Sequence, residues 1–183
     1  MANRASVSVR PDSALKMPLD AQRLRRILEL FCKAGGEDNA RLELAVTDDA
    51  RMEALHRQCL DRQGPTNILA FPAKGFSGEV RRGLPNGSSA DLSGELPEGL
   101  TRAPGAKGTI FLGSLVLSAD TLEREAFLYG QEAGDYCLRL LAHGFAHLLG
   151  YGHGAEMERL EEKLAQAGSK LVDGASLTFG SYS

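Results

Sequence analysis

The sequence contains no tryptophan and only three cysteines among its 183 residues. Cys32, Cys59 and Cys137 are odd in number and widely spaced, and they form no CxxC pair. This usage disfavours both a disulfide framework and a thiolate zinc site. Each cysteine falls on or beside an apolar stretch, where a free cysteine usually acts as a small hydrophobe. We therefore expect a reducing, cytoplasmic compartment.

Long apolar runs are also missing from the sequence. No run approaches the roughly 20 residues that a membrane-spanning helix requires. Residues 1–16 lack the apolar stretch, basic flank and small-residue cleavage site of a secretory signal. The sequence therefore predicts a cytoplasmic protein without a membrane partner.

The sequence also lacks an excess of positive charge, since its formal net charge is −3. Proteins that bind nucleic acid without a partner protein tend to be basic, since phosphate neutralisation supplies most of the non-specific affinity. The global charge thus gives no support to nucleic-acid binding. It leaves open a local basic groove, or a docking partner that supplies the affinity.

The periodicity of apolar residues predicts one layered domain over residues 1–183. Strands are expected near residues 7–9, 42–46, 67–71 and 109–118, and helices near 20–35, 48–59, 119–129, 135–149 and 156–167. The alternating strand at 42–46 reads as half-buried, whereas the continuous run 109–118 reads as buried on both faces. The pattern indicates an α+β or mixed α/β class around one sheet.

A segment rich in Gly, Pro and Ser interrupts this pattern at about residues 73–108. A loop of this length inside a compact domain is either functional or a tolerated surface insertion. We favour the insertion, with Asn86-Gly87 as a candidate hairpin turn.

Three of the four histidines lie in one short block. His143 and His147 are four residues apart on the strongest predicted helix, so their side chains share one face. Gly150 can end this helix in a left-handed conformation, and the following turn can return His153 as a third ligand. Three imidazoles with an open fourth position are the arrangement of catalytic zinc, although copper, nickel and iron also accept imidazole. The spacing therefore predicts a single-zinc hydrolase.

Two further positions bear on the interpretation of the histidine block. His56 lies near the end of the second predicted helix and is expected to be an ordinary packed histidine. The metzincin proteases share the spacing HExxHxxGxxH, with a glutamate that activates water after the first histidine. Gly144 occupies that position here, so peptide hydrolysis lacks its general base.

The block at residues 143–153, HGFAHLLGYGH, resembles the motif HGxLHLxGYDH of the YbeY endoribonucleases, which are bacterial rRNA maturation factors. Residues 65–72, PTNILAFP, are similar to the family's P-T-(D/N)-V-L-S-F-P. Residues 112–118, LGSLVLS, are similar to its L-G-D-I-V-I-S strand. The three blocks occur in the family's order, apart from the insertion after residue 72.

The resemblance implies a fold, an activity and a set of ligands. The fold would be a small mixed β-sheet packed by helices, with a zincin-like site of three histidines at the end of a core helix. The activity would be zinc-dependent, single-strand-specific endoribonucleolytic cleavage in 16S rRNA 3′-end maturation and ribosome quality control. One Zn²⁺ per chain would be held by His143, His147 and His153. The partners would be the 16S rRNA precursor and the small ribosomal subunit.

Three positions depart from the family pattern. The usual arginine before the P-T block is Leu60, the aspartate of the third block is Ser114, and the aspartate before the third histidine is Gly152. Arg57 and Arg62 are candidates to replace the missing arginine, because a guanidinium can pair with phosphate at some distance from its backbone.

These departures favour a second hypothesis, and a third stands apart from them. The chain could be an assembly factor that retains zinc and has lost cleavage, or a metallo-hydrolase of another substrate class, such as peptides.

Overall fold

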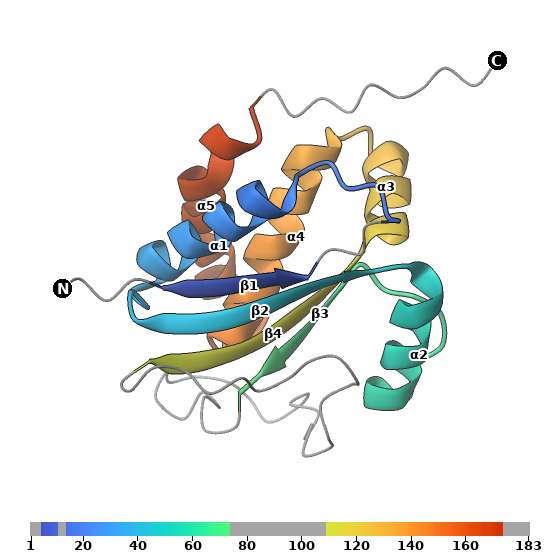
Figure 1. Cartoon of the computed structure of the whole chain (residues 1–183), viewed down its shortest axis with the longest axis horizontal. Helices are drawn as coiled ribbons and strands as arrows, with labels where there is room; N and C mark the ends of the chain where they lie inside the picture. Colours follow the sequence, from blue (N-terminus) through green and yellow to red (C-terminus); the bar gives the residue numbers. More distant parts are fainter. Residues whose placement is uncertain (1–4, 11–13, 74–108, 174–183) are drawn as a thin grey trace.

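The computed structural model describes residues 5–10, 14–73 and 109–173, which form one mixed sheet covered by helices (Figure 1). The strand order is β1-β2-β4-β3. Strands β1 (Ser6–Arg10), β2 (Ala40–Thr47) and β4 (Ile110–Ser118) are parallel, whereas β3 (Ile68–Pro72) runs antiparallel to β4. The expected α+β class with a small mixed sheet is confirmed.

The helices cover the two faces of the sheet unequally (Figure 1). Helices α1 (Ala21–Gly35), α4 (Ala133–Leu148) and α5 (Ala155–Gly168) pack together on one face and share the larger apolar core with the strands. Helix α2 (Asp49–Leu60) packs on the other face around a smaller cluster. Helix α3 (Ala119–Leu128) follows β4 directly, and a short 3₁₀ helix, Ser169–Leu171, follows α5.

Local signals set the helix boundaries that the sequence predicts. The side chain of Asp20 accepts a hydrogen bond from the backbone N–H of Arg23 at 2.8 Å, which caps α1. The side chain of Asp48 caps α2 in the same way. Gly36 ends α1 with φ of 82°, in the left-handed region that glycine adopts without strain. Such short-range hydrogen bonds act within one turn, which is why sequence locates these ends.

Strand β2 differs from its expectation of being half-buried. Glu43, on the face expected to meet solvent, is only 3% exposed. The reason is that β2 lies between β1 and β4 inside the sheet. Arg41 pairs with Glu43 at 3.6 Å, and its guanidinium lies 4.7 Å from the centre of the Phe111 ring.

The predicted insertion lies outside the described residues except for Ala73, so its interpretation as an insertion within one domain stays a prediction. The three cysteines are free, and burial raises the pKa of the Cys32 and Cys137 thiols to about 12. Among the helices that the structure describes, none is both long and apolar enough to cross a membrane.

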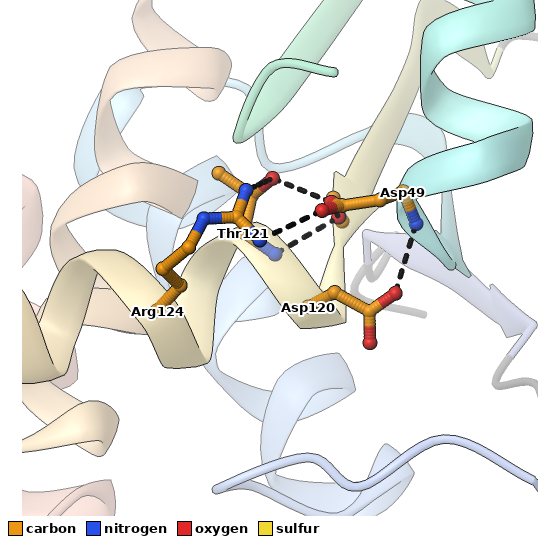
Figure 2. A network of polar contacts seen from close by, with 5 residues as sticks. Asp49, Asp120, Thr121 and Arg124 are labelled. Atoms are coloured by element: carbon orange, nitrogen blue, oxygen red, sulfur yellow. Dashed lines mark hydrogen bonds and ion pairs between the residues drawn. The ribbon is translucent and has the colours of Figure 1, made fainter. Parts of the chain in front are cut away.

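Helices α2 and α3 start side by side, at the ends of the adjacent parallel strands β2 and β4, and Asp49 joins them (Figure 2). One oxygen of Asp49 accepts hydrogen bonds from the hydroxyls of Ser118 and Thr121 at 2.6 Å each, and the other pairs with Arg124 at 2.8 Å. In return, the backbone N–H of Asp49 donates to Asp120 at 3.0 Å. Each helix thus supplies a carboxylate to the other helix start, where negative charge is favoured.

Replacing Asp49 with asparagine is expected to lower the free energy of unfolding by about 2 kcal/mol at neutral pH, because hydrogen bonds to a charged group are lost. Burial by itself would raise the pKa of Asp49, but the bonds from Ser118, Thr121 and Arg124 hold it below its ordinary value. A lowered folded-state pKa gives stability that is present above the unfolded value of about 3.9 and is lost as pH falls through the folded value.

Urea unfolding of the wild type and Asp49→Asn from pH 7 down to pH 3 measures this effect. The gap between the two proteins should be constant near neutrality and should shrink below about pH 4. The exposed Asp38 provides the control variant Asp38→Asn, which should match the wild type. A gap that stays constant down to pH 3 would contradict the assignment.

Candidate metal centre

Helix α4 positions the first two histidines by burying its opposite side. Leu141, Phe145 and Leu148 are fully buried in the core, and the Phe145 ring meets Phe31 edge-on at 5.7 Å. Gly144 faces the sheet, where a Cβ would lie only 2.7 Å from the Cδ1 atom of Ile68 in β3. With this side fixed against the sheet, the half-buried His143 and His147 share the outer side of the helix.

The turn after α4 brings the third histidine back. Gly150 adopts φ of 81°, and the backbone N–H of Tyr151 donates to the carbonyl of Ala146 at 3.1 Å. This is the helix end with a left-handed glycine that the sequence predicts. His153 then lies with its ring centre 5.4 Å from that of His143 and 5.0 Å from that of His147. One ligand atom from each of the three rings lies within 4.8 Å of the others.

Hydrogen bonds define which nitrogen of the two helical histidines faces the centre. Nδ1 of His143 lies 2.8 Å from Oε1 of Glu161, and Nδ1 of His147 lies 3.0 Å from the carbonyl oxygen of Tyr151. A carboxylate and a carbonyl only accept, so both Nδ1 atoms carry the hydrogen. Both Nε2 atoms are then acceptors in the neutral rings, yet they lie 3.1 Å apart. Two facing lone pairs at this distance call for a cation or a proton between them.

This geometry fits a zinc ion. Zn–N bonds of 2.0–2.1 Å in a tetrahedral site place ligand nitrogens roughly 3.4 Å apart, close to the 3.1 Å of the Nε2 pair. Burial lowers the pKa of His147, and the proximity of the His143 imidazole lowers it further, so the neutral form needed for ligation is favoured. His143 and His147 are half-buried and His153 is exposed, so the cluster lies near the surface rather than in the core.

The other residues singled out in the sequence, Arg57, Arg62 and Leu60, do not belong to the histidine cluster. Arg57 pairs within α2 with Glu53 at 2.6 Å, and Arg62 lies exposed in the loop that leads to β3. Leu60 is the last residue of α2 and is 37% exposed. The roles of Arg57 and Arg62 in substrate binding stay predictions.

Two further positions have clear structural surroundings. Ser114 is fully buried in β4, and among the residues that the structure describes its hydroxyl has no hydrogen-bond partner. His56 is half-buried, and its Nδ1 bonds to the carbonyl of Gly64 at 2.8 Å, which is the packing role expected of it.

Glu161 is the residue that sequence reasoning missed. It follows His143 by 18 residues on a different helix, so no local spacing connects the two. One signal was present in the sequence: Glu161 falls at helical spacing between Met157 and Leu164, on the stripe that α5 buries. A carboxylate at such a position needs a polar partner.

Comparison with known proteins identifies the family. Residues 12–173 match the family model described as Endoribonuclease YbeY. The chain belongs to this family. An Endoribonuclease YbeY of Nitratidesulfovibrio vulgaris is 40% identical over 156 residues, covering 85% of this chain and 88% of the relative. Another, of Oleidesulfovibrio alaskensis, is 35% identical over 160 residues, covering 87% and 89%.

A solved structure supports the fold independently. The chain is similar to a Thermotoga maritima protein whose solution structure is known, with a TM-score of 0.57 over 96% of this chain and 99% of that one. The sequence identity is 13%, so this likeness concerns the fold alone. The resemblance drawn from the three sequence blocks is confirmed by the YbeY family match.

Proposed function

We propose that the chain is a zinc-dependent, single-strand-specific endoribonuclease that acts in 16S rRNA 3′-end maturation and ribosome quality control in the cytoplasm. The observation that carries the proposal is the convergence of three histidine side chains in a chain of the endoribonuclease YbeY family. Phosphodiester cleavage suits such a site, because a metal can offset the charge that develops on phosphate oxygens.

Different residues of the chain have different proposed roles. His143, His147 and His153 would hold the zinc, which supplies Lewis acidity toward phosphate and water when bound. Arg57 and Arg62 are proposed to contact the RNA backbone, where a guanidinium can bind phosphate in a bidentate manner. Gly144 offers no carboxylate beside the site, so the proteolytic alternative lacks its general base. The small ribosomal subunit is the proposed partner that presents RNA to a protein of net charge −3.

A second function is favoured by specific substitutions. Leu60, Ser114 and Gly152 stand where the family usually has charged residues, and within the described part of the chain the buried Ser114 hydroxyl has no hydrogen-bond partner. An assembly factor that keeps zinc and binds the small subunit without cutting would tolerate these changes. The two functions share the metal and differ in turnover.

The deciding experiment incubates the purified protein with single-stranded RNA from the 16S rRNA 3′ end, with and without a chelator, and quantifies zinc. About one zinc per chain with chelator-sensitive cutting supports the nuclease. In the same assay, Arg57→Gln and Arg62→Gln should raise KM while kcat is kept, because uniform substrate binding is removed. One zinc per chain without cutting, alone or with small subunits, would overturn the nuclease in favour of the assembly factor.

A further inference from the structure

Helix α5 presents one acidic side chain toward the core and several toward solvent. Met157, Leu160 and Leu164 are buried, and Glu161 is half-buried between them, whereas Glu158 and Glu162 are exposed. A carboxylate held at the edge of an apolar core loses hydration, so it is stable there only with a polar partner. Glu161, unlike the exposed glutamates of α5, therefore requires a hydrogen-bond or ion-pair partner.

The partner is a predicted metal ligand. Oε1 of Glu161 accepts a hydrogen bond of 2.8 Å from Nδ1 of His143. This bond places the hydrogen on Nδ1 and leaves the lone pair on Nε2, the atom that faces His147 at 3.1 Å. It also fixes the rotation of the imidazole ring, because a carboxylate accepts in a restricted direction.

The same contact spans the loop that carries the third ligand. Residues 149–154 connect α4 to α5 and include the exposed His153. Gly154, the residue before α5, has no side chain that could cap the helix. The N-terminal part of the loop is held by the hydrogen bond from His147 to the backbone carbonyl of Tyr151. The hydrogen bond from His143 to Glu161 ties α5, which follows the far end of this loop, to the helix that carries the other two histidines.

We propose that Glu161 is a positioning residue of the metal centre, which orients His143 for ligation and, by tying α5 to α4, fixes the loop that carries His153. The inference rests on the proposed zinc site. It assigns to α5 a role in metal affinity that the three histidines alone do not account for. Carboxylates in this position also make the ligating imidazole a stronger donor.

An ordinary ion pair is the competing interpretation of this contact. If His143 were simply protonated and paired with Glu161, the contact would stabilise the fold and would be lost when metal replaced the proton. Removing Glu161 would then destabilise the metal-free protein and leave zinc affinity unchanged or increased. The positioning role predicts a loss of zinc affinity that exceeds any loss of stability.

The test compares Glu161→Ala, Glu161→Gln and the matched control Glu162→Gln, which changes an exposed glutamate one position further along the same helix. Zinc affinity is measured by competition with a chromophoric chelator, and site geometry by the visible spectrum of the cobalt-loaded protein. Glu161→Ala should weaken zinc binding about 10- to 100-fold. Glu161→Gln keeps an acceptor oxygen and loses the charge, so its loss should be smaller, and Glu162→Gln should match the wild type.

Thermal unfolding of each metal-free variant separates positioning from stability. If Glu161→Ala fails to fold, the isosteric Glu161→Gln still carries the test. Zinc affinity within twofold of the wild type, together with an unchanged cobalt spectrum, in a folded Glu161 variant would overturn the proposal. Absence of zinc binding by the wild type would instead remove the proposed function, so the two failures are distinguishable.

Discussion

Replacing His147 with alanine is expected to abolish stoichiometric zinc binding and to reduce RNA cleavage by about 10³-fold or more. His147 is central to the cluster, because its Nε2 lies 3.1 Å from that of His143 and its ring contacts His153. Losing one of three ligands removes the metal, and with it several kcal/mol of transition-state charge stabilisation. Each 1.4 kcal/mol or so corresponds to a factor of ten in rate.

The measurement pairs zinc quantification with cleavage of the single-stranded rRNA 3′-end substrate. His56→Ala is the matched control for metal content, since His56 bonds to the Gly64 carbonyl and does not belong to the cluster. This control should retain about one zinc per chain. RNA cleavage at the wild-type rate by zinc-free His147→Ala would show that the three-histidine site does not perform the reaction.

Introducing glutamate at Gly144 is expected to destabilise the protein severely rather than to create a peptidase. The substitution would restore the HExxH sequence pattern of the metzincins. In the structure, a Cβ at this position would lie 2.7 Å from the Cδ1 of Ile68 and 2.9 Å from the Cδ2 of Leu115. A carboxylate placed in this apolar contact between α4 and the sheet would be buried without a partner, at a cost of several kcal/mol.

Thermal unfolding and a peptide-library assay of Gly144→Glu measure this effect. Gly144→Ala adds only a methyl group and is expected to cost about 1–3 kcal/mol, because the neighbouring side chains must shift. Ala54→Glu, at an exposed position of α2, is the control and should leave the unfolding temperature near the wild-type value. A Gly144→Glu protein that is fully stable, or that cleaves peptides, would contradict this account of the site.

Much of the fold and the clustering of three histidines could be predicted from the sequence, because both depend on short-range patterns. Asp20 and Asp48 cap helices through hydrogen bonds that reach three residues along the chain. The spacing of His143, His147 and His153 indicates a shared helix face followed by a glycine-ended turn, and the structure brings their side chains together. Such features need only local backbone geometry.

The contacts between distant segments required the tertiary structure. The burial of Glu43 follows from the place of β2 between two other strands, which alternation along the strand does not show. Asp49 joins residues about 70 positions away because two parallel strands end side by side. Glu161 meets His143 because α5 folds back along α4.

The sequence by itself thus determined the elements, the family resemblance and the three candidate ligands. Only the tertiary structure decided what orients those ligands and what keeps Gly144 small. The physical reason is one of range. Periodicity, capping and ligand spacing act within a few residues, whereas hydrogen bonds and packing between elements depend on how the chain is folded in space.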